Sequence, residues 1–322
     1  MNLNAEFPKF DVMTVGDICV DLIVTGNVRP QFHQVEQIVT DCTLELGGSA
    51  TIFASQLGKL GAQVGVFGWV GDDGFGRFVI EKLQAAHVDT RYIQRHPSLK
   101  TGVGIALAEE NDRAILTYLG TIDATQPQDL DESALRSCRH WHIASYFLLK
   151  KLRNTWPDWL RTCKKMGLST SLDTNWDPDS QWRGVTDVLP FLDLFLPNEA
   201  EARAITGEED VMKAARKLAD YGPLVVVKLG EDGSIAVKGK EVWHLRPSPR
   251  TGLPEFVIDS VGAGDNFDAG FLRSYLLGKC TYDCLVSGHR CAISSLKYAG
   301  GVRGQLWNSA GSSLPSAPEG IV

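Results

Sequence analysis

The sequence has no long apolar run, either within the chain or at its start. A membrane-spanning helix needs about 20 consecutive apolar residues. Residues 1–10 include Glu6, Pro8 and Lys9, whereas a secretory signal peptide carries a continuous hydrophobic segment. We therefore predict neither a signal peptide nor a membrane partner, and we expect a cytoplasmic protein.

An excess of basic residues is also missing. The chain has 32 Lys and Arg against 39 Asp and Glu, which gives a formal net charge of −7. Nucleic-acid-binding domains usually present a basic face, so we expect no nucleic-acid partner. A pocket can be basic in an acidic protein, so anionic or phosphorylated substrates stay open.

Paired cysteine motifs are absent as well. The seven cysteines are an odd number, and no two are spaced as C-x-x-C. This pattern favours neither a disulfide framework nor a structural zinc site. We expect buried free thiols in a reducing compartment.

What the chain does have is the composition of an ordinary globular enzyme, with 43% hydrophobic and 22% charged residues among 322. Strand-like apolar runs alternate with helical patterns, including a helix predicted over residues 49–60 with Ser49 as its N-cap. The predicted strands are residues 10–15, 63–69, 141–146, 168–173, 192–196, 224–227 and 234–237. This alternation predicts a parallel sheet with helices on both faces.

Two segments depart from this alternation, at about residues 21–46 and 100–121. Both are rich in apolar and β-branched residues, and the second contains a polar turn typical of a hairpin. We predict that they project from the main sheet as a small lid, with ordinary surface hairpins as the alternative. Residues 309–322, rich in Ser, Gly and Pro, are predicted to form a flexible tail after a single domain of residues 1–308.

The most informative segment is FVIDSVGAGDNF at residues 256–267. A strand-like run ends at Asp259, and an amphipathic helix follows the small residues Gly262, Ala263 and Gly264. Small residues at a helix start let an anion approach unpaired backbone N–H groups at the positive end of the helix dipole. Asp265, in the first turn, is suited to take a proton from an attacking hydroxyl. The alternative is an ordinary helix start whose dipole Asp265 complements.

The string DSVGAGD at residues 259–265 resembles the second signature of the PfkB, or ribokinase-like, carbohydrate kinases, DTxGAGD. Ser260 replaces the threonine and keeps the hydroxyl. The resemblance implies an α/β fold with a doubly wound, mainly parallel sheet and a small β-strand lid, and ATP and Mg²⁺ as cofactors. It makes Asp265 the catalytic base and the Gly262–Gly264 amides an anion hole that also contacts ATP.

The first part of the chain extends the resemblance. GDICVD at residues 16–21 is similar to the family's GDxxxD strand end, which implies that Asp17 and Asp21 bind substrate hydroxyls; a turn-capping role is the alternative. Gly47 and Gly48 match the di-glycine that lets the backbone approach the sugar. Ile52 stands where the family usually has a substrate-binding asparagine, so that contact is lost.

The nucleotide side is implied by two further motifs. Asn198-Glu-Ala-Glu201 resembles the family's NxxE motif, in which Glu201 holds Mg²⁺ through water; a plain capping box is the alternative. KLGEDG at residues 228–233 resembles the loop beside the ATP phosphates, which implies roles for Lys228, Gly230 and Gly233.

Three further expectations follow from the resemblance. The first is a monovalent-cation site for K⁺ to which Asp259 contributes, and the sequence leaves its occupancy open. The second concerns the DxN segment with Asp173 and Asn175. Many relatives have arginine two residues after the asparagine, but this chain has Asp177 there, so we assign Asp177 no phosphate-binding role. The third is a homodimer that pairs through the lid.

The predicted function is ATP-dependent phosphorylation of a hydroxymethyl group on a sugar or sugar-like molecule, whose identity stays open. The alternatives are a nucleoside kinase of the same fold and a catalytically silent sugar-binding protein. A Rossmann dehydrogenase is disfavoured, because no G-x-G-x-x-G follows an early strand.

Overall fold

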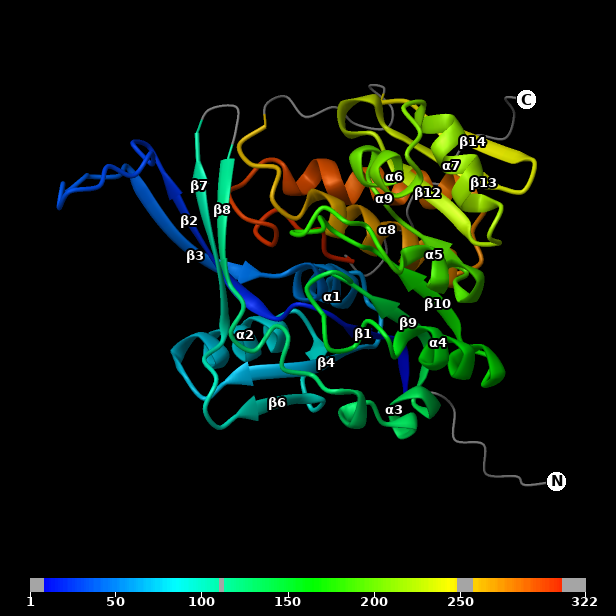
Figure 1. Ribbon diagram of the computed structural model, residues 1–322, viewed down its shortest axis with the longest axis horizontal. Coiled ribbons are helices and arrows are strands. Elements are labelled where there is room, and N and C mark those ends of the chain that lie inside the picture. The colour runs from blue at the N-terminus through cyan, green and yellow to red at the C-terminus, as the bar shows by residue number, and fades with distance from the viewer. Residues whose placement is uncertain (1–8, 110–112, 248–256, 309–322) are drawn as a thin grey trace.

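The main sheet of the protein has ten strands and is parallel over most of its width (Figure 1). The computed structural model describes residues 9–109, 113–247 and 257–308. Strand order is β14-β13-β12-β11-β10-β9-β1-β4-β5, with β6 also paired to β4. The strands are β1 (Phe10–Val15), β4 (Val64–Gly71), β5 (Val88–Asp89), β6 (Ile93–His96), β9 (Cys138–Ile143), β10 (Ser169–Leu172), β11 (Leu194–Phe195), β12 (Leu224–Lys228), β13 (Ser234–Lys238) and β14 (Glu241–Leu245). Only β13 and β14 run antiparallel to their neighbours.

Helices cover both faces of this sheet, each over its own apolar core. Along β1, Met13 and Val15 belong to one core and Val12 to the other, as the two-residue period of a strand requires. One face carries α1 (Ser49–Lys59), α2 (Gly74–Ala85), α8 (Ala263–Leu276) and α9 (Thr281–Ser295). The other carries α3 (Glu132–Arg136), α4 (Trp156–Lys165), α5 (Val185–Val188), α6 (Glu199–Thr206) and α7 (Val211–Ala219). The predicted doubly wound α/β fold is confirmed.

A separate four-stranded sheet projects from one side of this body (Figure 1). Its order is β3-β2-β7-β8, formed by β2 (Cys19–Thr25), β3 (Asp41–Gly47), β7 (Gly102–Ala108) and β8 (Arg113–Tyr118). β2 pairs antiparallel with β3 and parallel with β7, and β7 and β8 form a hairpin. The strands of this small sheet lie in or next to the two segments predicted to project from the main sheet, at about residues 21–46 and 100–121. The proposed tail, residues 309–322, lies outside the described residues.

The small sheet joins the body where two of its strands meet β1 and α1. Only three residues separate β1 from β2, and Gly48 alone separates β3 from α1. These two short connections place the first turn of α1 beside the carboxyl end of β1, and the candidate site is built there.

Several local predictions need correction. Ser49 is not the N-cap of α1: Gly48 holds that position with φ 82°, and it has no side chain to cap the helix. Residues 257–259 are not a strand, and Phe256 lies outside the described part of the chain. All seven cysteines are free, but Cys42 and Cys280 are exposed rather than buried. Among the described residues, no helix has the length and apolar character needed to cross a membrane.

Candidate active site

The N-terminus of α8 is open at its first turn. Gly262 is the N-cap, with φ 71° in the left-handed region that favours glycine, and it has no side chain to cap the helix. A β-carbon on Gly262 would lie 2.7 Å from the Cα of Gly301, so a larger residue would not fit. A glycine N-cap leaves room for an anion to approach the backbone N–H groups of this turn, of which Ala263 N–H also donates to the Ser260 carbonyl at 3.3 Å.

Asn266 and Gln305 hold this turn in place. The Asn266 amide donates to the carbonyls of Gly262 and Gly301, each at 2.8 Å. Gln305 Nε2 donates to Asn266 Oδ1 and to the Ile52 carbonyl, each at 2.9 Å. The side chain of Ile52 is buried against Gly262 and Gly301, so it supports the turn from below. The helix start, the loop at 301 and α1 thus form one unit.

Asp265 lies in the first turn of α8 and is only 8% exposed. Burial, with the neighbouring carboxylates of Asp173 and Asp17, raises the pKa of Asp265 to about 7, although Lys228 and the Ser49 hydroxyl oppose the shift. A carboxyl group with this pKa is partly ionised near neutral pH and can still accept a proton, which suits a general base.

Asp17 and Asp21 lie at the junction of the body and the small sheet. Asp17 Oδ1 accepts a hydrogen bond from the Ala50 N–H at 3.2 Å, and burial raises the pKa of Asp17. Asp21 is on β2, beside Gly47 on β3 and Gly104 on β7. A β-carbon on either glycine would overlap the Asp21 carboxylate, so the two glycines leave the space that this group occupies.

Lys228 is buried between two carboxyl groups beside α8. Its Nζ lies 3.0 Å from Asp173 Oδ2 and 3.0 Å from Asp268 Oδ2. Burial lowers the pKa of Lys228, but the two carboxyl groups outweigh burial and raise it above the usual value. A β-carbon on Gly264 would lie 3.4 Å from Lys228 Nζ, so the ammonium group is next to the turn that begins α8.

Asp173 and Asp268 differ in ionisation. Burial raises the pKa of Asp173, but Lys228 outweighs burial and lowers it, so Asp173 is the charged partner of the lysine. Burial raises the pKa of Asp268 well above its usual value. Sequence analysis noted Asp173 without a role and gave no signal for Asp268.

Asn198 and Glu201 form the capping box that was the alternative for this motif. The Glu201 N–H donates to Asn198 Oδ1 at 2.9 Å, and the Asn198 N–H donates to Glu201 Oε2 at 2.9 Å. Burial and the nearby Asp173 carboxylate raise the pKa of Glu201 to about 7. This geometry accounts for the motif structurally, so the magnesium role of Glu201 stays a prediction.

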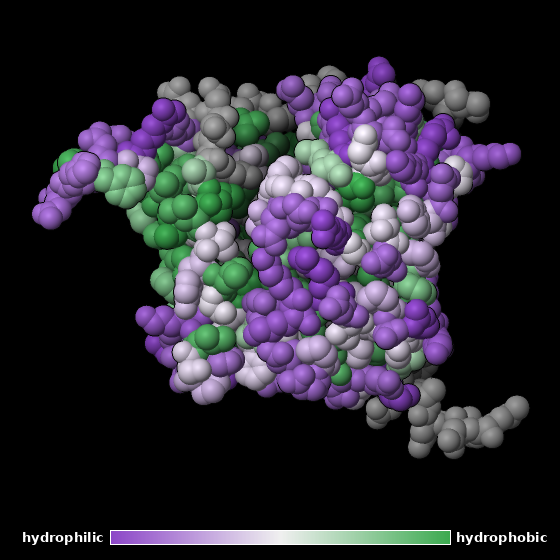
Figure 2. Space-filling model, in the orientation of Figure 1, coloured by the Kyte–Doolittle hydropathy of each residue, from purple (hydrophilic) through white to green (hydrophobic). Residues whose placement is uncertain are grey.

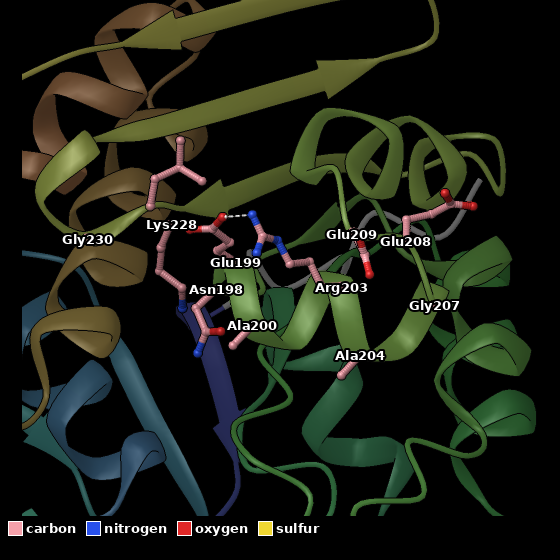
Figure 3. Close-up of a pocket in the computed structure, with 11 residues that line it drawn as sticks. Asn198, Glu199, Ala200, Arg203, Ala204, Gly207, Glu208, Glu209, Lys228 and Gly230 are labelled. Carbon is pink, nitrogen blue, oxygen red and sulfur yellow. Dashed lines mark ion pairs between the residues drawn. The ribbon is translucent and has the colours of Figure 1, made fainter.

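A cavity of about 1070 Å³ opens beside this capping box (Figure 3). It brings together three of the residues predicted to bind ATP, Asn198, Lys228 and Gly230. Arg203 and Glu199, also in the lining, form an ion pair with each other. Gly233, Gly262 and Gly264 are not part of this lining. The rest of the lining is Ala200, Ala204, Gly207, Glu208, Glu209 and Leu229.

Comparison with known proteins identifies the family. The profile of the pfkB family carbohydrate kinase matches residues 9–307, nearly the whole described chain. The chain belongs to the pfkB family. The resemblance and the carbohydrate-kinase class predicted from the sequence are therefore confirmed.

Individual pfkB relatives are distant but aligned along most of their length. An ATP-dependent 6-phosphofructokinase of Thermoanaerobacterium thermosaccharolyticum is 25% identical over 303 residues, covering 91% of this chain and 90% of the relative. A fructoselysine 6-kinase of Shigella flexneri is 28% identical over 287 residues, covering 89% and 97%. A putative ribokinase II of E. coli, solved with ATP and Mg²⁺, superposes with a TM-score of 0.80 at 24% identity, over 92% of this chain and 96% of that one. At that identity the structural likeness supports the fold alone.

Two loop aspartates of this pfkB chain bind backbone N–H groups. Asp259 Oδ1 accepts from Val261 and Oδ2 from Gly300, each at 2.9 Å. Asp177 is buried and accepts from the N–H groups of Gln181 and Trp182 at 2.7 Å. The cation role of Asp259 stays a prediction, and Asp177 organises its own loop.

Proposed function

We propose that this protein transfers the γ-phosphoryl group of ATP to a hydroxymethyl group of a sugar or sugar-like molecule, with Asp265 as the general base. The observation that carries the proposal is the buried carboxyl group of Asp265 in the first turn of a helix that begins at a glycine, where burial raises its pKa to about 7. Such a group can receive the hydroxyl proton as the oxygen attacks. Backbone N–H groups beside it can stabilise the charge on the transferring phosphoryl group.

Lys228 contributes to the same step through its positive charge beside the start of α8. Its ammonium group lies beside Gly264, and Asp173 and Asp268 hold it there. A fixed positive charge next to the N–H groups of residues 262–264 strengthens the anion hole without needing to move during the reaction. In this proposal Lys228 acts through the field at the turn, and the Gly262, Ala263 and Gly264 amides contact the phosphoryl oxygens.

ATP would lie in the cavity lined by Asn198, Lys228 and Gly230 and reach across Gly233 to the start of α8. Mg²⁺ binds oxygen ligands, keeps several waters and usually takes one or two protein carboxylates together with substrate phosphates. Among the described residues, no group of three His, Cys, Asp or Glu side chains could hold a metal by itself. A single buried carboxylate at Glu201 fits an ion that arrives with the nucleotide. When bound, Mg²⁺ would neutralise phosphate charge.

Asp17, Asp21 and the Gly47–Gly48 backbone would hold the acceptor molecule. Carboxylates accept hydrogen bonds from paired hydroxyls, which matches a polyhydroxylated substrate. Because Asp21 belongs to the small sheet and Asp17 to the body, a bound sugar would join the two. Movement of the small sheet over the site would exclude water, whose attack would waste ATP.

Three expectations remain part of this proposal. A K⁺ site near Asp259 rests on the family resemblance, and a cytoplasmic location rests on the missing signal peptide and apolar runs. A homodimer through the lid also rests on the family resemblance, and exposed apolar side chains on β8, Ile115 and Leu116, support it. Figure 2 shows apolar surface gathered over the small sheet, while polar residues cover most of the visible face of the body.

The test is a coupled ADP-release screen across sugars, sugar acids, phosphorylated sugars and nucleosides. The set includes fructoselysine and fructose 6-phosphate, on which the named relatives act. The Asp265→Asn protein serves as the blank. We expect ADP release that depends on one acceptor class and disappears in the blank. Release only with nucleosides would identify a nucleoside kinase. Sugar binding without ADP release by the wild-type protein would identify a silent sugar-binding protein.

A further inference from the structure

Asn175 connects two serines at the carboxyl edge of the main sheet. It follows β10, and its Nδ2 donates to Ser145 Oγ at 2.7 Å and also to Ser49 Oγ. Ser145 follows β9, and Ser49 begins α1. The three side chains therefore link two strand ends to the helix that starts at the candidate substrate site.

The backbone at two of these positions is in an unfavourable conformation. Asn175 has φ 52° and Ser145 has φ 53°, both in the left-handed region that non-glycine residues rarely adopt. Such conformations persist only where surrounding contacts enforce them, and they concentrate at functional sites. Glycine would adopt either conformation without strain, so the side chains at these two positions have a use that outweighs their backbone cost.

The direction of the hydrogen bonds is fixed by chemistry. An amide NH₂ group only donates, so both serine oxygens act as acceptors toward Asn175. Each hydroxyl has one proton of its own, which must then point to a different acceptor. The Ser49 hydroxyl lowers the pKa of Asp265, and the Ser145 hydroxyl lowers the pKa of Asp17, so each serine is close to one of these carboxyl groups. Because the amide occupies an acceptor site on each serine oxygen, each hydroxyl proton is left to point to a nearby carboxylate.

Asp265 needs such a donor because its other neighbours are mostly acidic. Asp173 at the end of β10 and Asp17 at the end of β1 face it with carboxyl groups, and only Lys228 at the end of β12 faces it with a positive charge. Burial and the two carboxylates favour the protonated form, which cannot act as a base. A hydroxyl donor favours the ionised form, as Lys228 does.

We propose that Asn175 is a positioning residue for catalysis: its amide orients the hydroxyls of Ser49 and Ser145 so that Asp265 stays available as the base and Asp17 as a substrate-binding carboxylate. This inference rests on the proposed function. Asn175 acts through the two serines and does not touch the reacting atoms.

Two substitutions at one position separate this role from a space-filling one. Asn175→Gly removes the amide and also relieves the left-handed backbone. Asn175→Asp keeps the shape and tolerates the backbone, but replaces the donor with an acceptor that would draw both hydroxyl protons away. Ser180→Gly is the matched control: Ser180 has φ 51°, is exposed and lies in the loop that follows Asn175.

The measurements are kcat and kcat/KM from about pH 5 to about pH 9, with the acceptor found in the screen, together with ATP affinity by calorimetry. Activity falls as pH drops through the pKa of the base. In Asn175→Gly we expect the acid limb of kcat/KM to move up by about one pH unit, the size expected for one lost hydrogen bond to a charged group. Asn175→Asp should move it further, while ATP affinity and Ser180→Gly stay at wild-type values.

Ser49→Ala extends the test. It should give the same shift of the acid limb as Asn175→Gly, and the double variant should shift it no further, because both changes remove one interaction. Additive shifts would overturn the proposal. So would an Asn175→Asp protein more active than Asn175→Gly, which is the order expected if Asn175 only fills space.

A readout without substrate keeps the inference separate from the proposed function. The carboxyl ¹³C titration of Asp265, assigned by its loss in Asp265→Asn, should have a higher midpoint in Asn175→Gly than in the wild type. An unchanged midpoint refutes the inference even if the protein is an active kinase. A raised midpoint with no ADP release for any acceptor supports the inference about the carboxylate and counts against the kinase proposal.

Discussion

The two sheets of this protein are buried to very different extents. In the main sheet, helices cover both faces, and Val225, Val226 and Val227 on β12 are fully buried. In the small sheet, Ile115 and Leu116 on β8 are more than half exposed. The small sheet is mixed, with β2 parallel to β7 and its other pairs antiparallel, and Ile115 and Leu116 are exposed on opposite faces of its edge strand β8. We call the main sheet, with its helices and the segment after α9, the floor, and it carries Asp265, Lys228 and Asp173. Asp21 lies on the small sheet, which has less support.

One ion pair ties the small sheet to the floor. Glu45 on β3 is buried and accepts from Arg303 Nε at 2.5 Å. Elements with few buried apolar contacts open at a lower free-energy cost than core strands. We therefore expect the floor to determine the chemical step and the small sheet to determine how the acceptor is held. The following changes test that division, from the largest expected effect to the smallest.

Asp265→Asn should lower kcat by about 10²–10⁴, the range for loss of a general base, while acceptor affinity is largely kept. The same change should stabilise the protein. Because burial raises the pKa of Asp265 to about 7, the stability linked to its protonated form is lost as pH rises toward 7. The gain in melting temperature should thus be larger at about pH 8 than at about pH 5. A folded variant with near-normal turnover would refute the catalytic role.

Lys228→Met should cost about 3–5 kcal/mol of unfolding free energy, because it leaves the buried, charged Asp173 without its cation. The matched control is Lys150→Met, which breaks the exposed ion pair with Asp179 and should cost less than about 1 kcal/mol. Chemical denaturation measures both. Similar costs for the two lysines would show that the floor does not depend on this buried cluster.

A pair of leucines compares the sheets directly. Leu194→Ala on β11, a fully buried position, should cost about 2–5 kcal/mol of unfolding free energy. Leu116→Ala on β8 should change it by no more than about 0.5 kcal/mol, as expected for an exposed position. Equal costs in denaturant titrations would mean that another part of the protein or a second copy covers β8 in solution.

Asp21→Ala should weaken acceptor binding by about tenfold to a hundredfold, the loss of a hydrogen bond to a charged group. ATP binding should change little, because the cavity proposed for the nucleotide is lined by residues between 198 and 230, outside the small sheet. Calorimetry with each ligand measures the two affinities. Equal losses for acceptor and ATP would contradict the assignment of substrate binding to the small sheet.

The sequence by itself determined the features that depend on contiguous residues. Period-two and helical patterns predicted β1, β4, β12 and β13, and the small residues before Asp265 predicted the open start of α8. Local patterns gave a wrong prediction where one residue type is typical of two neighbouring positions at a helix start. A serine before an apolar helix looks like an N-cap, but Gly48 takes that position and leaves the Ser49 hydroxyl for Asn175.

Only the tertiary structure decided which side chains meet. The pairs that Lys228 forms with Asp173 and Asp268 join residues 55 and 40 positions apart. Gln305 reaches the Ile52 carbonyl across 253 positions. These contacts depend on strand order and on crossovers that bring several strand ends to one edge, which no single stretch of sequence specifies. Local backbone preferences therefore pointed to Asp265 and the turn before it, while the charged groups around Asp265 became visible only in the folded chain.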